Sequence, residues 1–484
     1  MEEGYLSRFI KGILTTGFGT LVTLILGFMN IGIAARYIPK EQFGVFLLMQ
    51  TIVYSLIMVG DLGLNLSATK FLAVSREGER QTVINTIMVM RTAIAIAAVA
   101  LILLCRNQIT FLFKSEILEE FYVYIPLLFL LESYNLLFSS MLQGFHHYRK
   151  MAYAQMLASV TNVILIIVLI VFLGNGILGL VCARAVALVF SIVYQIRGIG
   201  MGLSFRGDRK LLKGLFGFGL PLGLNNVLSF IFMRFDTLII GALLAPVSVA
   251  LYGTAMKLPD AFRQMFESFR SVFFPNMAEL FDQKRMSEAE SVLNNSLRLI
   301  SFATLFVTLG ATVFQKEIVT LLFSAKYIEC APVLSVLMLA MSIGLIGYVL
   351  GTSLVSAGYS KLPVIINIVD TAVTLTANLI MIPRFGIIGA AYASVLARTV
   401  SNPVNLWFLK RAGIDVKAME YIKPIAAYGI CCALLSVLGN SLLPGLAALS
   451  LYLVLCAGTT VIRGEDLLNL KRIIRMNTQP ANVR

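Results

Sequence analysis

The sequence predicts an all-α protein that crosses a membrane many times, and three observations lead to this fold class. The 484 residues are 58% hydrophobic and only 13% charged, with a mean hydropathy of +0.87. A soluble protein carries roughly 25% charged residues, so this chain has too little polar sequence to cover a soluble fold. The apolar residues also occur in long blocks separated by short basic stretches, which is the pattern of spanning helices and their loops.

A spanning helix needs about 20 mostly apolar residues, and about fourteen blocks of the chain meet this requirement. The predicted spans are residues 10–35, 43–71, 83–104, 118–144, 152–173, 177–200, 212–244, 247–280, 293–314, 331–357, 362–382, 387–409, 422–438 and 443–462. The first block is longer than the roughly 7–15 apolar residues of a signal-peptide core, and no small-residue cleavage motif follows it. We therefore interpret it as a retained span.

The distribution of basic residues supports an even number of spans. With a cytoplasmic N-terminus, roughly 25 basic residues fall in one set of loops and about 7 in the other, as the positive-inside rule requires. This bias explains the formal net charge of +14 without a nucleic-acid partner. It predicts that both termini are cytoplasmic.

The chain also repeats itself. The stretch 28–46 has a counterpart in 232–252, and Gly176-Ile177-Leu178-Gly179 has one in Gly386-Ile387-Ile388-Gly389. An even number of predicted spans separates the copies, so they point the same way, as in parallel-repeat membrane folds. We expect an N-lobe of six spans at 1–205, a C-lobe of six spans at 206–415, two additional spans in 416–465 and a basic cytoplasmic tail at 466–484.

Charged side chains inside predicted spans are costly and usually face water or another polar group. The eighth span has the densest set, which consists of Lys257, Asp260, Arg263, Glu267 and Arg270. Their spacing of three or four residues places them on one helix face, next to a kink that Pro259 can introduce. Two interpretations remain open. The face lines a polar cavity with one net positive charge, or it forms a ladder of internal ion pairs.

Other spans carry fewer ionisable groups. Arg234 and Asp236 lie in the seventh span, where Asp236 aligns with Asn30 of the repeat, and an internal Arg–Asp pair is the alternative to a cavity role. Asp61 and Asn65 share a face of the second span because they are four residues apart. For the isolated charges we favour structural pairing over contact with a substrate. These are Arg91, Glu132, Arg184, Asp370 and Arg398.

Motifs for chemistry are missing from the sequence. It contains no G-x-x-x-x-G-K-[ST] loop and no H-E-x-x-H, and its six cysteines include no C-x-x-C pair. His146 and His147 occupy a basic loop and are interpreted as surface groups. The outer loops are too short to present a set of acid–base residues. We therefore predict a protein that is not an enzyme and holds no metal or cofactor.

Six segments along the whole chain carry a family resemblance: 36–39 (RYIP), 41–46 (EQFGVF), 60–64 (GDLGL), 234–241 (RFDTLIIG), 251–252 (LY) and 386–391 (GIIGAA). Together they resemble the polysaccharide-exporter branch of the multidrug/oligosaccharidyl-lipid/polysaccharide flippase superfamily, which includes the Wzx-type O-antigen flippases. The resemblance implies fourteen helices in two lobes, with the first, second, seventh and eighth spans around a central cationic cavity.

The resemblance also implies a function. An undecaprenyl-diphosphate-linked oligosaccharide would be flipped by alternating access from the cytoplasmic to the outer leaflet of the bacterial inner membrane, for cell-surface polysaccharide biosynthesis. Membrane lipids, a polysaccharide polymerase and assembly proteins would be its other partners.

We expect four basic residues to bind the diphosphate, because Lys and Arg form charge-assisted hydrogen bonds with phosphate oxygens. They are Lys257, Arg263, Arg270 and Arg234. Four acidic residues are candidates to carry a coupling proton or sodium ion or to orient these bases. They are Asp61, Asp236, Asp260 and Glu267.

Two alternatives remain. A cation-coupled multidrug exporter of the same superfamily would have an acidic or aromatic cavity, whereas the eighth span is net basic. A membrane enzyme that polymerises or ligates lipid-linked glycan would need a large outer loop, which the sequence does not provide.

Overall fold

The fold is that of a computed structural model, which describes residues 21–200, 202, 204, 207–359, 362–439, 441–459 and 461. All regular structure in these residues is helical. Residues 10–20 of the first predicted span and the predicted tail at 466–484 lie outside the described residues.

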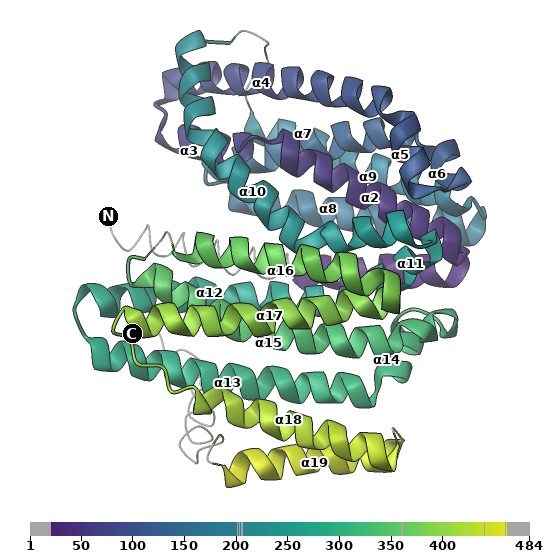
Figure 1. Ribbon diagram of the computed structural model, residues 1–484. Helices are drawn as coiled ribbons and strands as arrows, with labels where there is room; N and C mark the ends of the chain where they lie inside the picture. The colour runs from purple at the N-terminus through teal and green to yellow at the C-terminus, as the bar shows by residue number, and fades with distance from the viewer. Residues whose placement is uncertain are drawn as a thin grey trace, which may run out of the picture. The chain divides into compact units, whose positions relative to one another are not determined.

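The helices follow one another along the chain with short connections (Figure 1). They are Leu21–Tyr37, α2 (Lys40–Gly60), α3 (Leu64–Val74), α4 (Glu77–Leu104), α5 (Arg106–Phe113), α6 (Glu116–Phe121), α7 (Tyr124–Gly144), α8 (Tyr148–Ile166), the π-helix η1 (Ile167–Phe172), α9 (Gly176–Ile199), α10 (Arg209–Leu243), α11 (Pro246–Ala255), α12 (Lys257–Asp282), α13 (Met286–Val313), α14 (Gln315–Leu322), the 3₁₀-helix η2 (Ala325–Cys330), α15 (Ala331–Ser356), α16 (Leu362–Phe385), α17 (Ile387–Arg411), α18 (Met419–Leu438) and α19 (Leu442–Gly458).

Nine helices within the described ranges are long and apolar enough to cross a membrane, and Leu21–Tyr37 and Leu442–Gly458 are shorter apolar helices. Each predicted span overlaps at least one helix of the structure. The prediction of an all-α, multi-pass membrane protein is therefore confirmed.

Three predicted spans are broken where the sequence analysis expected continuous helices. The span 118–144 divides at Tyr122 and Val123 into α6 and α7. The span 43–71 divides into α2 and α3 at a turn in which Leu62 and Gly63 have φ values of 47° and 74°. This turn packs directly on α10, because a Cβ added to Gly63 would collide with the carbonyl oxygen of Gly219. The span 247–280 divides at Met256 into α11 and α12, and Pro259 stands in the first turn of α12, where proline is tolerated.

The structure comprises two compact units. Unit 1 takes in the chain up to Lys257 together with Val319–Cys330 and Thr371–Ala393, and unit 2 takes in Leu258–Ile318, Ala331–Asp370 and the chain from Ser394 onward. In unit 1, α7, α8 and α9 pack against one another, and α2 packs against both α10 and α11. The closest approach of α2 and α11 requires a glycine, since a Cβ on Gly44 would collide with the carbonyl oxygen of Pro246.

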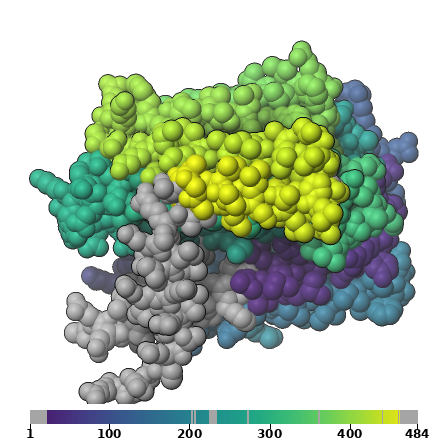
Figure 2. All heavy atoms as spheres, turned by 90° about the horizontal axis from the view of Figure 1, so that it is seen from below, coloured from purple at the N-terminus to yellow at the C-terminus, as the bar shows by residue number. Residues whose placement is uncertain are grey.

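Unit 2 is built around α13, which lies between α15 and α18, with α19 packed against α18 (Figure 1). Figure 2 shows α19, in yellow, at the surface. The outward faces of α18 and α19 carry large exposed apolar side chains, as a lipid-facing surface requires. They include Ile430, Val437, Leu438, Leu442, Leu443, Leu446 and Val454.

Local sequence signals set several helix ends outside the apolar spans. Asp208 caps α10, and its carboxylate accepts hydrogen bonds from the backbone N–H groups of Lys210 at 2.7 Å and Leu211 at 3.0 Å. These two bonds hold the pKa of Asp208 below its usual value. Gly200 ends α9 in the left-handed conformation, and Pro246 occupies the start of α11.

Candidate functional site

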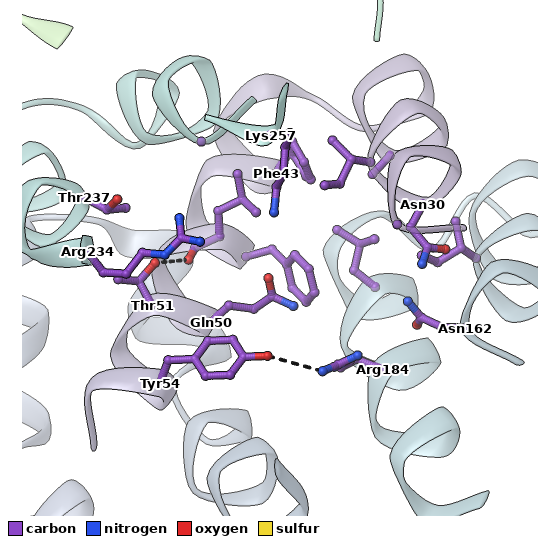
Figure 3. Close-up of a pocket in the computed structure, with 18 of the residues that line it drawn as sticks. Asn30, Phe43, Gln50, Thr51, Tyr54, Asn162, Arg184, Arg234, Thr237 and Lys257 are labelled. Carbon is purple, nitrogen blue, oxygen red and sulfur yellow. Dashed lines mark hydrogen bonds between the residues drawn. The ribbon is translucent and has the colours of Figure 1, made fainter. Parts of the chain in front are cut away.

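Unit 1 contains a cavity with a volume of about 520 Å³ (Figure 3). Its walls come from helix Leu21–Tyr37, from α2 and α8 to α11, and from the first residue of α12. The polar lining residues are Asn30, Gln50, Thr51, Tyr54, Asn162, Arg184, Arg234, Thr237 and Lys257. Apolar side chains that include Phe43, Phe46, Leu47 and Met58 fill the spaces between them. The volume falls in the lower half of the range for small-molecule sites, roughly 300–1,000 Å³.

Three of the described lining residues are cationic and none is acidic. Arg234 comes from α10, Lys257 from the start of α12 and Arg184 from α9. Figure 3 shows that these side chains reach the cavity from different sides. Arg184 is also tied to a neighbouring helix, because its Nε donates a hydrogen bond to Oε1 of the buried Glu132 on α7 at 2.7 Å. The cavity therefore favours a polar, anionic ligand.

Of the predicted site residues, the structure brings Arg234 and Lys257 together in this cavity. Asp61 instead lies at the break between α2 and α3, where Arg91 donates to its Oδ1 at 2.7 Å. The same arginine donates to Oδ1 of Asn65 at 2.7 Å, so Asp61 and Asn65 do share a face.

Asp236 is buried beside hydroxyl groups. It accepts hydrogen bonds from the hydroxyl of Tyr252 on α11, from the backbone N–H of Thr237 at 2.6 Å and from the Thr237 hydroxyl at 3.2 Å. Its carboxylate is thus held by donors of both α10 and α11 and is not among the cavity-lining groups.

The other four predicted residues lie on α12 within unit 2. Arg263 approaches Asp260 at 3.8 Å, and Arg270 approaches Glu267 at 3.5 Å. The hydroxyl of Tyr348 on α15 donates to Glu267 at 2.9 Å and accepts from Arg270 at 2.6 Å. The ion pairs of the ladder interpretation therefore form, yet the side chains of Glu267 and Arg270 remain about half exposed and accessible to a ligand.

Structural pairing is confirmed for the isolated charges. Arg91 pairs with Asp61, Arg184 with Glu132, and Arg398 with Asp370 at 2.8 Å. Sequence reasoning missed that Arg184 also lines the cavity, and it missed Asn162, Gln50 and Tyr54 altogether. No spacing in the sequence links these residues, because they meet only when separate helices pack. No group of three or more potential metal-ligating side chains occurs in the part of the chain that the structure describes.

Comparisons with known proteins agree with this picture. A family model described as "Polysaccharide biosynthesis protein" matches residues 33–332, which is more than half of the chain. A probable low-salt glycan biosynthesis flippase, Agl15, of Haloferax volcanii is 22% identical over 79% of this chain and 80% of that protein. A putative O-antigen transporter of Shigella flexneri is 23% identical over 79% of this chain and 93% of that protein.

Solved structures show the same fold. The lipid II flippase MurJ in an inward closed conformation has a TM-score of 0.74 with 14% identity, covering 94% of this chain and all of that one. An inward-facing multidrug resistance transporter of the MATE family has a TM-score of 0.69 with 16% identity, covering 81% of this chain and 94% of that one. The chain therefore belongs to the polysaccharide biosynthesis protein family, and it shares its fold with a lipid II flippase and with a multidrug resistance transporter.

Proposed function

We propose that the protein flips an undecaprenyl-diphosphate-linked oligosaccharide from the cytoplasmic to the outer leaflet by alternating access, for the synthesis of a cell-surface polysaccharide. The observation that carries the proposal is the cavity of unit 1, whose described lining has three cationic residues and no acidic one. A basic cavity suits an anionic diphosphate and disfavours a cationic drug. The names of the relatives, a glycan biosynthesis flippase and an O-antigen transporter, support the same substrate class.

Within the cavity, we assign the diphosphate to Arg234 and Lys257. Both side chains present N–H donors to a space that is partly shielded from water, where charge-assisted hydrogen bonds to phosphate are stronger than in solution. Arg184 donates to the buried Glu132, and we assign it mainly the role of holding the cavity wall. Arg263 and Arg270 lie on α12 in unit 2, and we assign them contacts with the same head group at another stage of the cycle.

The acidic residues divide into two groups. Each of three acidic residues lies within 4 Å of an arginine: Asp61, Asp260 and Glu267. We assign these residues the role of orienting the arginine side chains. Asp236 accepts hydrogen bonds from hydroxyl and backbone N–H donors, which leaves it as the candidate for a coupling proton or sodium ion.

The proposed topology has about fourteen spans: twelve in two six-helix lobes and two additional spans. The nine long apolar helices and the two shorter ones account for eleven of these spans. The other three are α10, α11 together with α12, and α17. We place the lobes at 1–205 and 206–415, the additional spans at 416–465, and both termini in the cytoplasm. The protein would reside in a bacterial cytoplasmic membrane and hand its product to a polymerase and assembly proteins.

The test is a flipping assay in proteoliposomes with a fluorescent undecaprenyl-diphosphate-linked sugar. Arg234→Ala and Lys257→Ala should each weaken binding by about 10–100-fold, the effect of losing one hydrogen bond to a charged group. Arg106→Ala is the matched control, since it removes an equally basic but exposed side chain on α5 outside the cavity. Each variant is first checked for a monodisperse profile and an unchanged melting temperature.

Two results would contradict the proposal. A folded wild-type protein that moves no lipid-linked sugar but exports cationic drugs would be a multidrug exporter. Equal activity of Arg106→Ala and Arg234→Ala would mean that the cavity does not bind the diphosphate. Arg263→Ala is a further probe, since it should lower activity with normal expression, whereas a failure to fold would favour the ladder interpretation of α12.

A further inference from the structure

The cavity of unit 1 is lined by neutral carboxamide groups as well as by cations. Figure 3 shows Arg234 of α10 on one side, Asn30 of helix Leu21–Tyr37 and Asn162 of α8 on the opposite side, and Gln50 of α2 between them. We call Asn30 and Asn162 the amide pair. A diphosphate needs the cations, so the amide pair calls for a separate explanation.

Both members of the amide pair have an unsatisfied acceptor. Asn162 is only 9% exposed, and its side-chain oxygen is buried without a hydrogen-bond partner in the described part of the chain. The side-chain oxygen of Asn30 is also buried without a hydrogen-bond partner among the described residues. A buried polar atom that lacks a partner costs about 1–3 kcal/mol, and native proteins rarely keep one without a reason. Two such atoms belong to residues that line one cavity, which singles out these carboxamides as groups whose hydrogen bonds a ligand would complete.

The backbone of α8 is also unusual next to Asn162. The helix becomes π-helical at Ile167–Phe172, directly after Ile166, which lines the cavity one turn beyond Asn162. π-Helical segments are rare and occur frequently at functional sites, because the wider turn changes which side chains face a given direction. This feature is independent of the unsatisfied oxygens, and it marks the same wall of the cavity.

We propose that the amide pair is the subsite for the sugar that is attached directly to the diphosphate, and that Asn162 is its main specificity-determining residue. This inference rests on the proposed function. A sugar hydroxyl both donates and accepts hydrogen bonds, and an acetamido group offers an N–H donor and a carbonyl acceptor, so either group matches a carboxamide. The cavity of about 520 Å³ has room for one sugar beside the phosphate groups, and we assign that sugar to the amide pair.

The stability of an Asn162 variant distinguishes a structural role from a role in sugar binding. If its side chain supported the fold, Asn162→Leu would lower the melting temperature. Under the subsite proposal, the substitution removes an unsatisfied buried group and fills the same volume with apolar atoms. The apo protein should then be as stable as the wild type or more stable, while the affinity for sugar falls.

The experiment compares the binding of three lipids to the full-length protein in nanodiscs: undecaprenyl diphosphate, undecaprenyl diphosphate with one glucose, and undecaprenyl diphosphate with one N-acetylglucosamine. Asn162→Leu and Asn30→Leu should weaken the binding of at least one sugar-bearing lipid by about 3–10-fold, the effect of one neutral hydrogen bond. Their affinity for the sugarless lipid should not change. Asn107→Leu, an exposed asparagine on α5, is the matched control.

The outcomes separate this inference from the proposed function. If Asn162→Leu weakens all three lipids equally or changes none of them, the amide pair is not a sugar subsite, although Arg234→Ala can still abolish binding and support the flippase. If the wild-type protein binds none of the three lipids, the proposed function fails and the subsite with it. The difference between the glucose and N-acetylglucosamine arms identifies whether a hydroxyl or an acetamido group provides the donor.

Discussion

The ion pair between Arg91 and Asp61 allows a quantitative prediction. Its atoms are 2.7 Å apart, and the two side chains are only 1% and 4% exposed. Arg91 also donates to Asn65 at 2.7 Å and to Ser133 on α7 at 3.1 Å. One guanidinium thus joins the α2–α3 break to α4 and α7.

Arg91→Met should destabilise the protein by about 3–5 kcal/mol. Methionine keeps most of the volume, so the loss comes from leaving the Asp61 carboxylate buried without its cation, which is the usual cost of breaking a buried pair. The double variant Asp61→Asn/Arg91→Met removes both charges and should recover most of this loss, because two neutral groups avoid the desolvation penalty.

The measurement is a thermal melt of purified protein in detergent, with flipping activity recorded for each variant that folds. If Arg91→Met has the melting temperature of the wild type, the reasoning is refuted, because the ion pair between Arg91 and Asp61 would then not be buried in the folded protein. A double variant that is stable but inactive would give Asp61 a role in coupling beyond that of a charge partner.

Three further predictions concern stability. Gly63→Ala should lower the free energy of unfolding by about 1–3 kcal/mol or more, because this position has a positive φ and lies against Gly219. The control is Gly78→Ala, at an exposed position of α4 with open space around it, which should be neutral or stabilising in a thermal melt. Arg36→Ala removes two hydrogen bonds to the carbonyls of Leu321 and Phe323 and should lower the melting temperature more than Lys40→Ala. The lysine variant removes only one ion pair, whose partner Glu329 is 64% exposed and which is worth about 0–1 kcal/mol. The reverse order would contradict this ranking. Burial lowers the pKa of His147, and the nearby Lys150, Arg80 and His146 lower it further. The folded state therefore binds the proton of His147 more weakly than the unfolded chain does, so stability should be full above about pH 6.5 and decrease as the pH falls below it. His147→Gln should flatten this part of a profile of melting temperature against pH.

Much of the fold could be predicted because the bilayer imposes simple requirements. A segment inside lipid must satisfy its own backbone hydrogen bonds and therefore forms a helix. For this reason the length of the apolar blocks was enough to predict the spans, and every predicted span overlaps a helix of the structure. The breaks in the second and eighth predicted spans were missed for a physical reason. Leu62 and Gly63 are as apolar as a continuous helix requires, and only the close approach of Gly219 explains their left-handed conformation.

The candidate site was harder to predict because helical periodicity gives the face of a side chain but not its partner. The charged stripe of α12 drew attention to one helix, and only its first residue, Lys257, lines the cavity of unit 1. The amide pair had no comparable signal. Asparagine is neutral and small, so a single Asn30 or Asn162 barely alters the hydropathy of an apolar block.

Arg184 shows why a charge inside a membrane cannot be classified as structural or functional by its pairing alone. It pairs with Glu132, as expected for an isolated charge, and it nevertheless forms part of the cavity wall. A buried arginine needs a carboxylate to offset its desolvation, and the same carboxylate fixes the guanidinium where a ligand can reach it. Replacing Arg184 would therefore remove both a structural pair and a cavity cation, so its loss of activity would be ambiguous. Arg234→Ala and Asn162→Leu test the two sides of the cavity without breaking that pair.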